Sequence, residues 1–86
     1  MSLGPTVVYN RFFAITPSDT VNFTDVQQQE MVGLYVGGAG NAVIVMGDDT
    51  TITLSGLLAG TIYPMRCKRI NSTNTTATLL RGLLQV

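Results

Sequence analysis

The sequence has no histidine, no tryptophan and a single cysteine, Cys67. A disulfide within the chain is excluded because it needs two cysteines, whereas a bridge to another chain is not. A structural zinc site draws about four ligands from Cys and His, so it is excluded as well. We expect Cys67 to fill a core or interface position as a small apolar side chain. The sequence predicts no metal and no other cofactor.

The residues that usually carry out catalysis are also missing. Without histidine, a nucleophilic triad lacks its usual base. The neighbouring carboxylates Asp48 and Asp49 would serve acid–base chemistry or cation binding only if further oxygens converged on them, and no EF-hand-like spacing surrounds them. The glycine-rich segment 37–40 leads into an apolar strand instead of a helix, so it does not match a phosphate-binding loop. The chain is therefore predicted not to be an enzyme.

Charged residues are scarce, at 12% of the chain, against about 25% in an average globular domain. Five basic residues balance five acidic ones. A neutral chain has no long-range attraction to nucleic acid or to an anionic membrane, and it tends to self-associate. No apolar run reaches the length of a membrane span, and the N-terminus does not resemble a signal peptide. We expect no nucleic-acid partner, no membrane partner and synthesis in a cytoplasm.

The 86 residues are enough for one domain, 1–86, in which residues 1–6 are a candidate flexible extension. A chain of this size buries only about 60% of the surface that its unfolded form exposes. Disulfides, a structural metal or oligomerisation usually supplement so thin a core. Since the first two are excluded, oligomerisation remains, and a composition that is 45% hydrophobic favours it.

Apolar residues recur mostly at every second position, and Gly, Asn and Asp interrupt them about every ten residues. Twelve threonines also favour a pleated surface. The pattern predicts an all-β fold, a small antiparallel β-sandwich or partly closed barrel of six to seven strands. A single helical turn is predicted near residues 25–29. The expected strands lie at residues 7–15, 31–36, 42–46, 50–55, 61–70 and 77–86.

Turn residues suggest how these strands connect. The glycine-rich link between 31–36 and 42–46 predicts a hairpin. A second tight turn is expected at Gly47–Asp49, because glycine and aspartate tolerate turn conformations. Pro64 has no N–H to donate, so strand 61–70 should lie at a sheet edge or carry a bulge.

Strand 42–46 reads as apolar on both faces, and strand 79–86 does so less cleanly. A sandwich of this size has one core, so the outer face of such a strand needs a second partner, for which another copy of the chain is the natural candidate. The alternative is a central strand with ordinary exposed aliphatic side chains. The candidate oligomer interface comprises Ala42, Val43, Ile44, Val45, Met46, Arg66, Lys68 and Arg69.

Arg66, Lys68 and Arg69 form the only cluster of charge. Three interpretations stay open: a solvated face that protects a sheet edge, a seam of ion pairs with another copy, and a nucleic-acid patch. The acidic partners in the second case would be Asp19, Asp25 or Glu30. The third is the weakest, because the chain is neutral and no aromatic residues alternate with the basic ones.

Four motifs, in this order and spacing, resemble short virion proteins of tailed phages. They are Ala14–Thr20 (AITPSDT), Leu34–Asn41 (LYVGGAGN), Ala59–Arg66 (AGTIYPMR) and Thr75–Thr78 (TTAT). Together they span residues 14–80, and the named group they most resemble is the head spike base proteins of phage-like gene transfer agents. The chain departs from that group's commonest form between Phe23 and Val32, where Thr24–Gln29 replaces a shorter link that contains proline.

The resemblance implies a phage virion structural protein, either a capsid spike base or a decoration protein. It implies a symmetric homo-oligomer, a pentamer at a fivefold vertex or a trimer at local threefold points, in contact with capsid and fibre proteins. The expected location is the virion surface after synthesis in the bacterial host cytoplasm. An alternative function is a tail or fibre-associated carbohydrate-binding module, in which Tyr9, Tyr35 or Tyr63 would stack on sugars.

Overall fold

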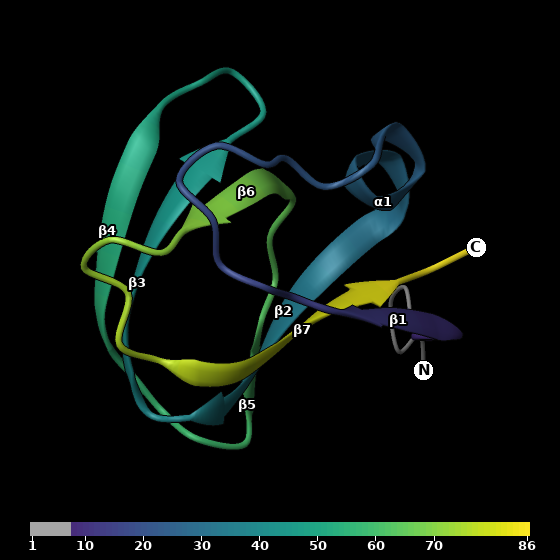
Figure 1. Ribbon diagram of the computed structural model, residues 1–86. Helices are drawn as coiled ribbons and strands as arrows, with labels where there is room; N and C mark the ends of the chain where they lie inside the picture. Colours follow the sequence, from purple (N-terminus) through teal and green to yellow (C-terminus); the bar gives the residue numbers. More distant parts are fainter. Residues whose placement is uncertain (1–7) are drawn as a thin grey trace, which may run out of the picture.

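A computed structural model describes residues 8–86 of the chain (Figure 1). The predicted extension 1–6 and the predicted start of the first strand at residue 7 lie outside the described residues. This part of the chain forms seven strands and one short helix. Their bounds are β1 Arg11–Ala14, α1 Asp25–Glu30, β2 Met31–Gly38, β3 Gly40–Met46, β4 Thr51–Leu57, β5 Thr61–Tyr63, β6 Cys67–Asn71 and β7 Thr78–Leu84.

The strands form two antiparallel sheets that pack face to face. One sheet has the order β1-β7-β2-β5, and the other has the order β4-β3-β6. In Figure 1 β4 and β3 lie on the left and β1 lies on the right, while β2 and β7 run between the right side and the lower left. The sheets do not close into a barrel. The predicted all-β fold is confirmed, as a small sandwich.

The core lies between the sheets, and strands from both sheets contribute to it. Its largest fully buried side chains come from β2 and β7 of one sheet and from β3 and β6 of the other. In such strands successive side chains point to opposite faces, so every second residue reaches the core. The largest fully buried side chains are Met31, Leu34, Val36, Ile44, Cys67, Ile70 and Leu80.

Helix α1 begins at a capping box. The Thr24 Oγ1 accepts a hydrogen bond from the Gln27 backbone N–H (3.1 Å), and the Gln27 Oε1 accepts one from the Thr24 N–H (2.9 Å). This reciprocal pair satisfies backbone donors that a helix start leaves without partners. The predicted helical turn near residues 25–29 is confirmed.

The predicted hairpin between 31–36 and 42–46 is wrong, because β2 and β3 belong to different sheets. The chain crosses from one sheet to the other at residue 39. A Cβ on Gly40 would lie only 2.6 Å from the Ala77 backbone N, and one on Gly38 would clash with the Thr78 side chain. These glycines therefore let residues 77–78 pack closely against the crossing.

The predicted strand 61–70 is two strands, β5 and β6, and each is the edge of a different sheet. The break covers Pro64–Arg66. Pro64 has no N–H with which to continue a ladder, so the pairing stops there and the chain changes sheet. Its predicted association with a sheet edge is confirmed.

The predicted turn at Gly47–Asp49 is confirmed as the connection of the β3–β4 hairpin. The Met46 N–H donates to the Thr50 carbonyl (2.8 Å), and the Asp49 N–H donates to the Met46 carbonyl (3.0 Å). Asp49 adopts a φ of 70°, a left-handed conformation that aspartate tolerates better than most residues.

Candidate assembly surface

Strand β3, the predicted interface strand, is the central strand of its sheet. Ala42 and Ile44 are fully buried and belong to the core cluster between the sheets. On the opposite face, Val43 and Val45 are only 8% and 3% exposed. The expectation that the second face of 42–46 is bare in the single subunit is therefore wrong, and within residues 42–46 only Met46 is half-buried.

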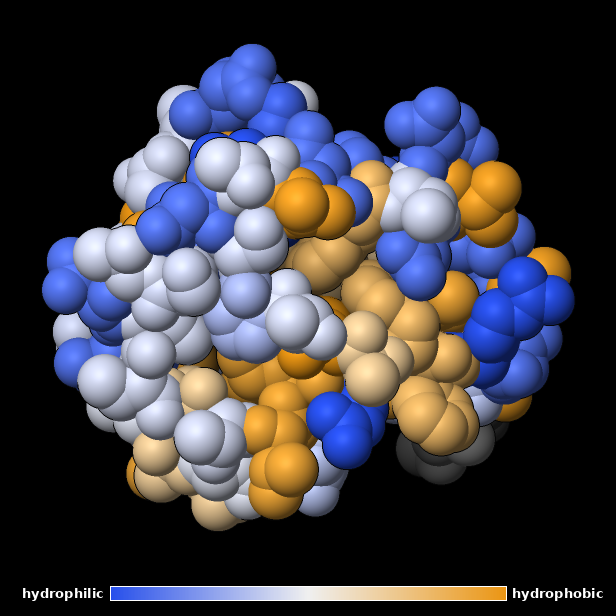
Figure 2. All heavy atoms as spheres, in the orientation of Figure 1, coloured by the Kyte–Doolittle hydropathy of each residue, from blue (hydrophilic) through white to orange (hydrophobic). Residues whose placement is uncertain are grey.

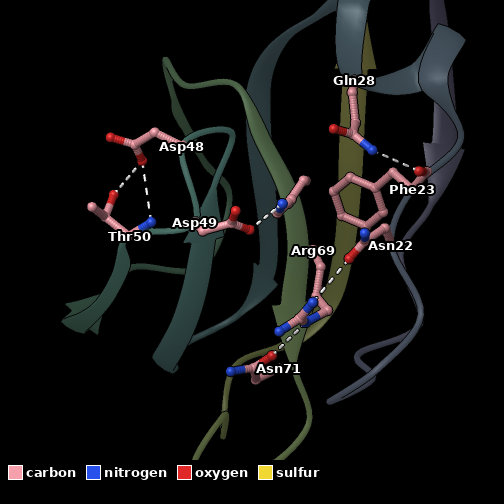
Figure 3. Close-up of polar contacts among 9 residues, drawn as sticks. Asn22, Phe23, Gln28, Asp48, Asp49, Thr50, Arg69 and Asn71 are labelled. Atoms are coloured by element: carbon pink, nitrogen blue, oxygen red, sulfur yellow. Dashed lines mark hydrogen bonds and ion pairs between the residues drawn. The ribbon is translucent and has the colours of Figure 1, made fainter.

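The outer face of β3 is covered by side chains of the same subunit. In the pairing of β3 with β6, Val45 lies opposite Arg69 and Val43 lies opposite Asn71, so these side chains share a face. The Arg69 Nε donates to the Asn71 Oδ1 (2.9 Å), and its Nη1 donates to the Asn22 Oδ1 (2.9 Å) (Figure 3). The aliphatic stem of an arginine held in this way covers apolar neighbours.

All three residues of the basic cluster have partners inside their own subunit. The Lys68 Nζ forms an ion pair with the Asp49 carboxylate (Figure 3), and the Arg66 Nε donates to the Met31 carbonyl (3.1 Å). Arg69 bonds Asn22 and Asn71, as described above. A contact of this cluster with another copy of the chain stays a prediction. In such a contact, Arg66, Lys68 and Arg69 would keep or exchange the partners that they have within their own subunit.

The segment before α1, residues 18–23, covers the outer edge of β6. The sequence alone did not predict this covering. The Ser18 N–H donates to the Ile70 carbonyl (2.8 Å), and the Phe23 N–H donates to the Lys68 carbonyl (2.7 Å). Phe23 also packs edge-on against Phe13, with 4.9 Å between ring centroids, and the Gln28 side chain donates to its carbonyl (Figure 3). Because these partners lie far apart in the sequence, no local pattern indicated the covering.

The adjacent carboxylates Asp48 and Asp49 bind different partners. Asp48 accepts hydrogen bonds from the Thr50 hydroxyl (2.6 Å) and N–H (3.1 Å), and these bonds lower the pKa of Asp48. Asp49 pairs with Lys68. Within residues 8–86, no three His, Cys, Asp or Glu side chains are grouped so as to hold a metal ion. The pair supports neither of the chemical roles considered above.

Cys67 lies in the core, as predicted. Its Sγ is 3.9 Å from the Met31 Sδ, and burial raises the pKa of its thiol to about 12. At neutral pH such a thiol stays protonated and is a poor nucleophile.

The three tyrosines differ in exposure. Tyr9 is 39% exposed, whereas Tyr35 and Tyr63 are half-buried. The Tyr63 hydroxyl accepts a hydrogen bond from the Leu58 N–H (2.9 Å), so its polar end is used within the subunit. Of the three candidate sugar-stacking residues, Tyr9 is the most exposed, and a carbohydrate-binding role stays a prediction.

The exposed apolar side chains belong to segments other than β3. Ile52 in β4 is 49% exposed, and Phe12 in β1 is 67% exposed. Both strands are the outermost strands of their sheets. Ile52 lies opposite Ile44 and shares its core-directed face, but at the edge of the sheet it is incompletely covered. Other exposed apolar side chains are those of Val8, Val21, Val26, Leu58, Ile62, Leu79 and Val86.

Figure 2 shows one face of the molecule, on which apolar side chains form an orange and tan band over β7 and β1 between two more hydrophilic lobes.

Within the described residues, no helix has the length and apolar character needed to cross a membrane.

No protein-family model matches the chain, and no curated protein matches it. Among solved structures, it is similar to a chain in the capsid of a native gene-transfer-agent (GTA) particle computed with C5 symmetry. The TM-score is 0.76 and the sequence identity is 32%, over 88% of this chain and 83% of the other. With that identity over most of both chains, the protein belongs to the family of this GTA capsid chain, a family of phage-like virion structural proteins.

Proposed function

We propose that this protein is a non-enzymatic component of the outer surface of a phage-like head, where it serves as a spike base or decoration protein. The observation that carries the proposal is its 32% identity to a chain of the GTA capsid, with the same fold at a TM-score of 0.76. Its location would be the virion surface, after synthesis in the bacterial host cytoplasm.

Copies of the chain form a symmetric ring in this proposal. The similar chain belongs to a capsid computed with C5 symmetry, and the ring proposed here is a pentamer at a fivefold vertex, with a trimer at a threefold point as the alternative. The sequence supports self-association independently, because only 12% of its residues are charged and its net charge is zero. The further partners are a capsid protein below the ring and a fibre protein above it.

Electron cryo-microscopy of particles made with and without this chain tests the proposal. We expect deletion of the chain to remove density from the outside of the head at the fivefold vertices, while the shell itself remains closed. Loss of density at the tail, or heads with unchanged vertices, would refute the head-surface role. Density lost at threefold points would instead identify a decoration trimer.

A further inference from the structure

The four edges of the sandwich differ in how well they are protected from other strands. Natural sheets blunt their edges with charges, proline, short strands or covering segments. Strand β6 carries Lys68 and Arg69, and backbone bonds from Ser18 and Phe23 cover its outer side. Strand β5 has only three residues, and Pro64 follows it directly. These two edges are closed to a further strand.

Strand β4 has none of these protections. Its seven residues, Thr51–Leu57, include no charge and no proline, and within residues 8–86 it pairs with β3 alone. The Met46 N–H donates to the Thr50 carbonyl and Val45 lies opposite Thr51. In the alternating antiparallel ladder, this register directs the N–H groups of Thr51 and Thr53 away from β3. The outer side of β4 thus presents backbone donors to a further strand.

Strand β1 is the corresponding edge of the other sheet; it has four residues and one charge, Arg11, but no proline, and the part of the chain described here pairs it only with β7. The Ile15 N–H donates to the Leu80 carbonyl (3.0 Å), and Ala14 lies opposite Arg81. The N–H of Ala14 therefore points away from β7. Alternation along β1 directs the N–H of Phe12 outward too.

We propose that the outer edge of β4 pairs with the outer edge of β1 in a second copy of this chain. Figure 1 shows β4 and β1 on opposite sides of the molecule. A contact between two different surfaces is heterologous, and repetition of such a contact forms a ring when the rotation closes. The inference rests on the proposed function, since the ring is the assembly proposed for the head surface.

The chemistry of the two edges is compatible. The charged residue of β1 is Arg11, which lies 3.6 Å from the Glu30 carboxylate of its own subunit, and β4 has no charge to oppose it. Each edge exposes a large apolar side chain, Phe12 in β1 and Ile52 in β4. Both side chains lie beside the proposed contact, so pairing of the two edges would reduce the exposed apolar area of each.

Proline substitutions at outward N–H groups test the contact. Thr53→Pro should block the β4 edge and Ala14→Pro the β1 edge, without removing a ladder bond inside the subunit. We expect each variant alone to be a folded monomer by circular dichroism and native mass spectrometry. An equimolar mixture should give a one-to-one dimer and nothing larger, because one intact β4 edge and one intact β1 edge remain. Thr53→Val and Ala14→Val, which keep the N–H, should assemble like the unsubstituted chain.

Several results would overturn this contact. The unsubstituted chain could stay monomeric across micromolar concentrations, either proline variant could keep the unsubstituted mass, or the mixture could stay monomeric. Thr53→Lys and Ala14→Lys place a charge at the same edges without changing the backbone, and they decide the matter if a proline variant does not fold. An assembly that survives all four blocking substitutions places the contact elsewhere, and the head-surface role, which the particle maps test, is unaffected.

Discussion

The Phe13 ring packs directly on Gly82, its partner across β1 and β7. A Cβ added to Gly82 would clash with Cε1 and Cζ of that ring and would lie 2.9 Å from its Cδ1. The other side of the contact is Phe23, whose ring meets Phe13 at 73°. The absence of a side chain at Gly82 thus lets β7 and the segment before α1 pack on the same aromatic ring of the edge strand β1.

Gly82→Ala should destabilise the fold by about 1–3 kcal/mol, the usual cost of extra volume in a packed site. Urea denaturation measures the free energy of unfolding. Gly47→Ala is the matched control, because no atom lies within 4 Å of a Cβ at that position, and we expect its effect to stay within about 0.5 kcal/mol. If the two substitutions change the free energy of unfolding equally, the packing of the Phe13 ring does not require the absence of a side chain at Gly82.

The Cys67 thiol should not react with a disulfide reagent in the native protein at pH 8, and should react fully in denaturant. The reason is its burial, which also raises its pKa to about 12. Absorbance of the released thiolate measures the reaction. Rapid stoichiometric labelling of the folded chain would contradict the core position.

The pKa of Asp19 should rise in Thr73→Val. The Thr73 hydroxyl (2.5 Å) and N–H (3.0 Å) both donate to the Asp19 carboxylate, and they lower its pKa from 3.8. The substitution removes the hydroxyl and keeps the N–H. Carboxyl chemical shifts followed through a pH titration measure the change. Asp48, whose donors come from Thr50, is the internal control and should not move.

The same shift predicts how stability depends on pH. Because the pKa of Asp19 is lower in the folded chain, its contribution is present above pH 3.8 and is lost as the pH falls through the folded value. Thr73→Val should therefore lose less stability than the unsubstituted chain on acidification below pH 3.8. If the free energy of unfolding falls equally with pH in the two proteins, the Thr73 hydroxyl is not the cause of the lowered pKa of Asp19.

Val43→Asp and Ile44→Asp should both prevent folding, because each places a carboxylate at a buried position of β3. Thr53→Asp, on the exposed side of β4, is the control and should stay folded. Circular dichroism distinguishes the outcomes, and a folded Val43→Asp variant would restore the outer face of β3 as a candidate interface.

The sequence by itself determined the class of this protein. Alternating apolar residues predicted strands, and the absence of histidine and of a second cysteine excluded a histidine-based triad, a zinc site and an internal disulfide. The turn at Gly47–Asp49 was also predictable, because glycine and aspartate tolerate turn conformations. Pro64 indicated a sheet edge or a bulge, whereas the strand ends there and the chain changes sheet. The resemblance to phage virion proteins rested on residues that the comparison with the GTA capsid covers in large part.

Only the tertiary structure decided which strands share a sheet and which edges remain open. The alternation of apolar residues at every second position assigns a residue to one face of its strand. It does not identify the neighbouring strand, because ladder partners such as Gly33 and Leu83 are distant in sequence. For this reason the apolar strand β3 was mistaken for a surface, although Arg69 and its neighbours cover it. Exposure of Ile52 and Phe12 follows from edge positions, which depend on non-local hydrogen bonds and not on the residues themselves.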